Sequence, residues 1–213
     1  MYQCKLRTYL SQLESGASIL SVEKKLRQAL SQRQKFYISD PHRISSAVLI
    51  PLYKKEGEYH ILFIQRTDRV KDHKGQISFP GGAYEEDDDD LRQTALREAA
   101  EEVGLSAEDV EVLGELDDLR TIGSNYVISP FVARMPWPYQ LKVDEWETEE
   151  IIEVPISILL DKGNISQDKT ILDGKEIDQY YYHYQDKVIW GATARILNQF
   201  LGILADIIES EGP

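Results

Sequence analysis

Three glutamates in one short stretch have a spacing that could hold metal ions: Glu98, Glu101 and Glu102. Side chains three and four positions apart lie on the same side of an α-helix, here within an arc of roughly 100°. Like charges at this spacing destabilise an isolated helix by roughly a few tenths of a kcal/mol per pair. Hard divalent cations bind carboxylate oxygens and would offset this repulsion. The alternative is a solvated acidic face, the ordinary role of such a run when nothing around it suggests a site.

A glycine pair lies upstream of the acidic stretch, where residues 79–82 read FPGG. Glycine lets the backbone approach a ligand closely and lets a carbonyl oxygen turn toward a metal ion. By itself a pair of glycines is more often only a turn. Its place before the three glutamates favours a metal site over a solvated face.

The order of these residues resembles the Nudix box, a loop-helix-loop signature that contains a glycine, an acidic residue and the helix pattern REUxEExGU. Residues 97–105 match the helix pattern at every defined position. The loop departs from it, because the first acid is Asp89 instead of glutamate and six residues instead of five separate it from Gly82. The resemblance implies a Nudix fold, hydrolysis of a nucleoside diphosphate linked to another moiety, and dependence on Mg²⁺ or Mn²⁺.

The resemblance also implies a role for each matching residue. Asp89 and Arg97 would form an ion pair that braces the loop against the helix, and Gly82 and Gly104 would be structural members of the motif. The implied metal ligands are Glu98, Glu101, Glu102 and the carbonyl oxygen of Gly81. The metal ions would neutralise the diphosphate, align an attacking water and lower its pKa.

The general base is expected among the glutamates of the box helix or of a later acidic segment, KVDEWETEE at 142–150. Glu147 is favoured, because it matches an acid in the family's acidic segment before the sequence EVP. Glu150 and Glu98 are the alternatives. The other glutamates of the segment are expected to be solvated.

Residues 61–82 resemble the additional signature of Nudix coenzyme A pyrophosphatases, LLTxxR[SA]xxxRxxxGxxxFPGG. Arg66, Gly75 and Phe79 stand where that signature has them, and Lys71 replaces its second arginine. Lysine keeps the positive charge but lacks the bidentate fork with which arginine binds phosphate. The resemblance makes these four residues the expected substrate contacts. Surface charge is the alternative role for the arginine and the lysine.

Two later segments, 150–155 and 189–197, also look like the same subfamily, so the resemblance covers about residues 45 to 200. It implies cleavage of coenzyme A, or its derivatives, into adenosine 3′,5′-bisphosphate and 4′-phosphopantetheine. The nearest alternative is a Nudix hydrolase of ADP-ribose, dinucleoside polyphosphates or nucleoside triphosphates. A Nudix module that senses a nucleotide without cleaving it is disfavoured, because all three helix glutamates are present. Candidates for stacking on adenine are Tyr53, Tyr126, Trp137, Trp146 and the tyrosines at 180–184, although aromatic residues more often serve packing.

These residues must be positioned by the elements that the hydrophobic pattern predicts. An amphipathic helix is expected to begin near Ser18 or Ser21, and a second one spans 91–103, with Asp90 and Gln93 as a capping box and Gly104 as its end. A long helix covers 193–208. Strands are expected at 45–51, 59–65, 77–79, 110–116, 126–135 and 150–156. The resulting fold class is α/β, a Nudix fold in which helices sandwich a mixed central sheet, with added N-terminal and C-terminal helices. We expect a helical extension at 1–40 and a Nudix hydrolase domain at 41–213.

The composition limits which binding partners and which cellular compartment we expect for this protein. Lys and Arg number 24 against 37 Asp and Glu, a net charge of −13, which is unsuited to binding nucleic acid. Cys4 is the single cysteine, so no intrachain disulfide can form. The N-terminus lacks the apolar region of a signal peptide, and no stretch has the ~20 apolar residues that span a bilayer. We therefore expect a cytoplasmic protein with a small nucleotide diphosphate substrate and no nucleic acid or membrane partner; family habit suggests a homodimer.

Overall fold

The computed structural model describes residues 19–69, 75–172 and 174–209. Within this part of the chain one sheet contains eight strands, in the order β3-β2-β1-β7-β5, with β4 beside β1, β6 beside β7 and β8 beside β2. The strands are β1 Ile44–Lys55, β2 Glu58–Arg66, β3 Ile77–Ser78, β4 Gly81–Ala83, β5 Glu111–Glu115, β6 Leu119–Arg120, β7 Tyr126–Arg134 and β8 Thr148–Pro155. β1 and β7 are parallel, whereas the other pairs are antiparallel. The predicted mixed sheet is therefore confirmed.

The helices fall where the periodicity predicts them. They are α2 Ile19–Gln32, α3 Leu91–Val103, α4 Ile156–Leu160 and α5 Gly191–Glu209, with short 3-10 turns η1 Ala107–Asp109 and η2 Lys162–Asn164. The sequence predicts α2, α3 and α5, but α4 is too short for its periodicity to be visible. Among the described residues, no helix combines the length and apolar character needed to cross a membrane.

β1 and β2 form a hairpin with a two-residue turn. Lys55 pairs with Glu58, and the turn residues Glu56 and Gly57 have φ of 52° and 89°. Positive φ at both turn positions matches the right-handed twist of the strands that a two-residue turn joins. The strands predicted on either side of this charged turn are thus confirmed as a pair.

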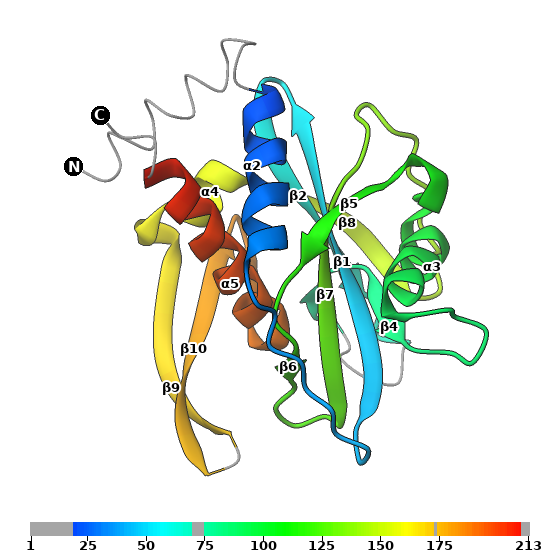
Figure 1. Ribbon diagram of the computed structural model, residues 1–213, viewed down its shortest axis with the longest axis vertical. Helices are drawn as coiled ribbons and strands as arrows, with labels where there is room; N and C mark the ends of the chain where they lie inside the picture. The colour runs from blue at the N-terminus through cyan, green and yellow to red at the C-terminus, as the bar shows by residue number, and fades with distance from the viewer. Residues whose placement is uncertain (1–18, 70–74, 173, 210–213) are drawn as a thin grey trace.

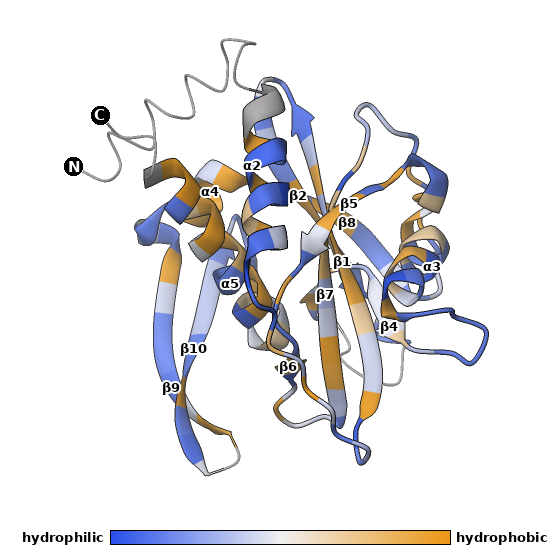
Figure 2. Cartoon of the chain, in the orientation of Figure 1, coloured by the Kyte–Doolittle hydropathy of each residue, from blue (hydrophilic) through white to orange (hydrophobic). Residues whose placement is uncertain are grey.

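Both faces of the large sheet are buried, as alternate residues of β2 show. Ile61 and Phe63 belong to a core that includes residues of α2 and α5, whereas Leu62 and Ile64 belong to a second core with α3. Figure 1 shows α2 and α5 on one side of the sheet and α3 on the other. In Figure 2, α5 is largely hydrophobic, and the loop between β4 and α3 is hydrophilic. Because successive side chains of a strand point to opposite faces, a strand covered on both sides needs an unbroken apolar run. The predicted α/β/α sandwich is confirmed.

The ends of α3 are held by local hydrogen bonds. A carboxylate oxygen of Asp90 accepts from the backbone N–H of Gln93 at 2.8 Å, as predicted. The Gln93 side chain, however, accepts from the N–H of Asp89 and not from that of Asp90, so the box is shifted by one residue. Gly104 ends the helix with φ of 70°, and its N–H donates to the carbonyl oxygen of Ala100. These ends fix the position and length of the acidic helix.

A second sheet, which the sequence does not predict, consists of β9 Ile165–Leu172, β10 Lys175–Tyr184 and β11 Lys187–Ile189. Most residues of β9 are exposed or half-buried, so this strand lacks the clear apolar alternation by which strands are found. The sheet packs on α5, where the hydroxyl of Tyr182 donates to Asn198 at 3.1 Å. The tyrosines at 180–184 therefore belong to a strand that packs beside the C-terminal helix.

The N-terminal helix packs on the sheet. A Cβ atom added to Gly114 of β5 would lie 2.6 Å from Cβ of Leu30 in α2, so glycine is what allows this close approach. Packing alone does not define a domain boundary, and the division near residue 40 stays a prediction.

Candidate active site

Glu102 is the most buried of the three helix glutamates. Its Oε2 accepts a hydrogen bond from the N–H of Gly81 at 2.9 Å, and its Oε1 accepts from Nη1 of Arg66 at 3.0 Å. Burial raises the pKa of the Glu102 carboxyl to about 8, and these two contacts only partly oppose the rise. The helix thus holds a carboxylate whose negative charge is incompletely compensated.

Glu98 lies beside it against the glycine pair. A Cβ atom added to Gly82 would clash with Oε1 of Glu98, so the carboxylate would have to move to make room for any other residue there. Its Oε1 accepts from Nη1 of Arg97 at 2.8 Å, and burial raises the pKa of the Glu98 carboxyl. The close backbone approach expected from the glycine pair is therefore present, at a carboxylate of the helix.

Glu101 differs from the other two in its exposure. Its side chain is 59% exposed, and its Oε2 accepts from Nη1 of Arg97 at 3.2 Å. Within the described part of the chain, no group of three or more acidic, histidine or cysteine side chains is already arranged around a common point. The reason is visible in the contacts, because the inner carboxylates turn toward arginines and a backbone N–H. Their hard oxygen donors nevertheless suit a divalent cation, which would supply the missing positive charge.

The loop before α3 is braced by Asp88 and not by Asp89, which corrects the sequence prediction. Asp88 accepts from Nε of Arg97 at 3.0 Å and from its Nη2 at 3.1 Å, a bidentate ion pair. The hydroxyl of Thr94 adds a hydrogen bond at 2.8 Å. The Arg97 hydrogen bonds are the main cause that lowers the pKa of the Asp88 carboxyl to about 2. Asp89 is exposed, and its backbone N–H caps the helix instead.

The spacing along the sequence between Gly82 and the aspartates explains why Asp88, and not Asp89, binds Arg97. Five residues separate Gly82 from Asp88, which is the spacing between the glycine and the acid in the family signature. The sequence contains four consecutive aspartates at 87–90 and does not by itself distinguish among them. Counting the family spacing through this run would have identified the buried one.

Glu147, the favoured base, lies beside the same carboxylate group. Its Oε2 is 3.8 Å from Nη2 of Arg66, which also contacts Glu102, and the side chain is 44% exposed. Its charge also contributes, after burial, to the raised pKa values of Glu98 and Glu102. The structure therefore brings Glu147 and Glu102 together around Arg66.

Glu150, a rival for the base, lies elsewhere. Its carboxylate pairs with Lys187 of β11, which also donates to Gln65. A bulge between β2 and β8 pairs Arg66 with Thr148 and Gln65 with Glu150, so Arg66 and Glu150 point to opposite faces of the sheet. Glu150 is therefore not placed to act as the general base, which corrects the sequence prediction.

The predicted substrate contacts have different positions in the structure. Arg66 reaches the carboxylate group, as described. Gly75 donates its N–H to the carbonyl of Arg66 at 3.0 Å, with φ of 66°, and so closes the loop that follows β2. Phe79 is buried and stacks on Phe63 at 4.8 Å between ring centroids, on the sheet face opposite α3. Its role is packing, in place of the predicted substrate contact. Lys71 lies outside the described residues.

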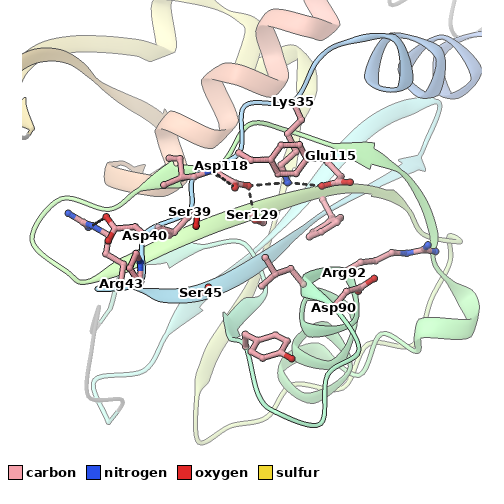
Figure 3. A pocket seen from close by; sticks show the side chains of 17 residues that line it. Lys35, Ser39, Asp40, Arg43, Ser45, Asp90, Arg92, Glu115, Asp118 and Ser129 are labelled. Atoms are coloured by element: carbon pink, nitrogen blue, oxygen red, sulfur yellow. Dashed lines mark hydrogen bonds and ion pairs between the residues drawn. The ribbon is translucent and has the colours of Figure 1, made fainter.

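A pocket of about 910 Å³ lies at the other end of α3, between residues 35–43, the sheet and residues 84–92. Figure 3 shows Lys35 in it beside Asp118 and Glu115. Nζ of Lys35 lies 3.0 Å from Asp118 and 2.6 Å from Glu115, so these charges compensate one another. The pocket is not lined by Glu98, Glu101, Glu102 or Glu147. The chemistry of the box therefore lies outside it.

The sequence of this chain is similar to those of known proteins. The family model described as "NUDIX domain" matches residues 43–174. A protein of Photorhabdus laumondii named "Uncharacterized Nudix hydrolase NudL" is 36% identical over 162 residues, which are 76% of this chain and 85% of that protein. A Yersinia pestis protein of the same name is 35% identical over 161 residues, 76% of this chain and 79% of that protein.

Among solved structures, a "MutT/nudix family protein from Enterococcus faecalis" superposes with a TM-score of 0.54 at 17% identity. The match covers 94% of this chain and 74% of that one. At this identity the likeness concerns the fold alone, and it extends over the terminal helices as well as the central sheet.

Proposed function

The chain belongs to the Nudix hydrolase family and is a pyrophosphohydrolase, and we propose that it cleaves the diphosphate bond of coenzyme A or its derivatives. The products would be adenosine 3′,5′-bisphosphate and 4′-phosphopantetheine. Divalent metal dependence is typical of the family, and we propose Mg²⁺ or Mn²⁺ as the cofactor.

One observation carries the substrate proposal. Arg66, the arginine by which residues 61–82 resemble the coenzyme A pyrophosphatase signature, lies 3.0 Å from Glu102 and 3.8 Å from Glu147. An arginine at this place can bind diphosphate oxygens beside the bond that is cleaved. Gly75, another residue of that signature, binds the backbone of Arg66 and so supports its position.

We assign the metal ligands to Glu98, Glu101, Glu102 and the carbonyl oxygen of Gly81. Bound divalent cations would neutralise charge on the diphosphate and lower the pKa of the attacking water. Glu102 is buried and Glu98 is partly buried, and both have raised pKa values, so a nearby cation would favour their ionised forms. Glu101 is exposed and would turn toward the other two.

The remaining residues act through their own contacts. Glu147 is half-exposed beside Arg66 and would accept the proton of the attacking water. Arg66 would exchange its contacts with Glu102 and Glu147 for the substrate diphosphate. Arg97 is structural, because Asp88 and the carbonyl oxygen of Ala83 already bind it.

The test is a product analysis with purified protein. Coenzyme A, ADP-ribose, diadenosine polyphosphates and nucleoside triphosphates are incubated with Mg²⁺, with Mn²⁺ and with chelator, and the products are resolved by mass. Metal-dependent formation of adenosine 3′,5′-bisphosphate and phosphopantetheine is the expected result. Preferred turnover of another diphosphate would overturn the substrate, and binding of nucleotide with no turnover would favour a sensing module.

A further inference from the structure

Trp146 combines high exposure with a fixed backbone. The residue is 64% exposed, an unusual environment for the largest apolar side chain. Its carbonyl oxygen accepts from the hydroxyl of Thr67 at 2.7 Å, and its N–H donates to Asp144 at 2.8 Å. The N–H of Asp144 in turn donates to the carbonyl of Glu102 at 3.1 Å. The backbone of Trp146 is therefore held at a defined place between α3 and the end of β2.

One face of this ring has a cationic neighbour. The guanidinium carbon of Arg69 lies 5.7 Å from the centroid of the Trp146 ring, within the range of a cation–π contact. The N–H of Arg69 donates to the Thr67 hydroxyl at 3.3 Å, so the same threonine ties both residues. Since the tryptophan remains largely exposed, the indole retains surface for a second flat group.

Trp146 is a sequence neighbour of a residue at the reaction centre. Glu147 follows it directly, approaches Arg66, and through Arg66 is linked to Glu102. Three of the other candidate aromatics are less suited: Tyr53 and Tyr182 are buried, and Trp137 is occupied by stacking on Tyr53 at 4.7 Å.

We infer that Trp146 binds the base of the nucleotide substrate by stacking on the purine ring, with Arg69 as the positioning residue that orients the indole. This inference rests on the proposed function, because it assumes that a nucleotide diphosphate reacts at the carboxylate group. Stacking suits this strongly acidic chain, because it needs no net positive charge. By alanine substitution, stacking of one base on an aromatic side chain contributes about 1–3 kcal/mol, or roughly 5-fold to 150-fold in affinity.

The first test uses AMP and ribose 5-phosphate, which carry the same phosphate and differ by the base. Binding is measured by calorimetry in Mg²⁺, and neither compound contains the diphosphate bond that the enzyme cleaves. We expect Trp146→Ala to weaken AMP binding roughly tenfold and to leave ribose 5-phosphate binding unchanged. Trp146→Phe should restore most of the affinity. Trp190, 43% exposed beside α5, offers the matched control Trp190→Ala, which should change neither.

Fluorescence supplies a second readout. AMP should quench the tryptophan emission of the wild type and of Trp190→Phe, but not that of Trp146→Phe. Arg69→Ala should weaken AMP binding less than Trp146→Ala does, and Arg69→Lys should recover part of the loss because it retains a cation.

The outcomes separate this inference from the proposed function. Unchanged AMP affinity in Trp146→Ala, an equal loss for AMP and ribose 5-phosphate, or no AMP binding by the wild type would each overturn the inference. Base-selective binding that depends on Trp146, without turnover of any diphosphate, would support the inference and overturn the proposed function. Turnover of coenzyme A with a KM unaffected by Trp146→Ala would do the reverse.

Discussion

α3 takes part in two ion pairs between an arginine and a carboxyl group, and the pKa of the carboxyl group is lowered in one pair and raised in the other. Asp88 accepts two hydrogen bonds from Arg97 and one from Thr94, and its pKa is lowered to about 2. Glu102 accepts one hydrogen bond from Arg66, and its pKa is raised to about 8, chiefly by burial. Both carboxyl groups are nearly inaccessible to water.

The two pairs differ in how completely the arginine compensates the negative charge of the carboxylate. The guanidinium of Arg97 faces Asp88 in a bidentate pair, which closes the loop against the helix and satisfies both partners. Arg66 divides its contacts between Glu102 and Glu147 and satisfies neither completely. A satisfied pair stabilises structure, whereas a buried carboxylate with a deficit of positive charge is suited to a cation that arrives with the substrate. The following experiments would break or sharpen this comparison.

The largest expected effect is on turnover. Glu102→Gln keeps the size of the side chain and removes the charge, so kcat/KM with Mg²⁺ should fall by ~10³-fold. The fold should persist, as measured by circular dichroism and by the thermal midpoint in chelator. Glu86→Gln, in the exposed loop before α3, is the control and should retain activity. Full activity of Glu102→Gln would remove the metal-ligand assignment.

Substitution of the proposed general base should lower activity less than Glu102→Gln does. We expect Glu147→Gln to lower kcat by ~10²-fold, because the general base no longer accepts a proton, and to remove one limb of the pH–rate profile. Glu150→Gln provides the matched control, since Glu150 pairs with Lys187 and points to the face of the sheet opposite Arg66. If Glu150→Gln were the variant with the altered profile, the assignment of the base would be reversed.

The structural ion pair is tested through stability. Asp88→Asn should lower the free energy of unfolding at pH 7 by about 2 kcal/mol, the value expected from a carboxyl whose pKa drops from 3.8 to about 2 on folding. Asp89→Asn should change it by less than about 0.5 kcal/mol, as for other exposed positions. Urea denaturation measures both. A larger loss for Asp89→Asn would return the ion pair to the residue that the sequence suggested.

The pH dependence of that pair should be the smallest and most specific signal. Because folding lowers the Asp88 pKa, its contribution is complete above the ordinary value near 4 and is lost as the pH falls toward 2. The stability difference between the wild type and Asp88→Asn should therefore shrink over this interval. A difference that stays constant between pH 5 and pH 2.5 would contradict the charged pair.

The sequence by itself determined the features that depend on residues close together in the chain. Apolar periodicity and capping residues predict α3, because Asp90 and Gly104 act through neighbours within four positions. The β1–β2 hairpin follows from two apolar runs around a short charged turn. The family signature likewise depends on spacing within one helix, and it identifies the three glutamates without knowledge of the rest of the molecule.

Only the tertiary structure decided contacts between distant segments. Which of four aspartates binds Arg97 depends on the path of the loop, and which glutamate approaches Arg66 depends on a bulge between β2 and β8. Phe79 is a core residue because alternate positions of the chain there face opposite sides of the sheet. These choices depend on side-chain direction and long-range packing, which a shift of one residue reverses. The placement of Trp146 beside Arg69 is of the same kind, because the two residues are 77 positions apart in the sequence and only the fold brings them together.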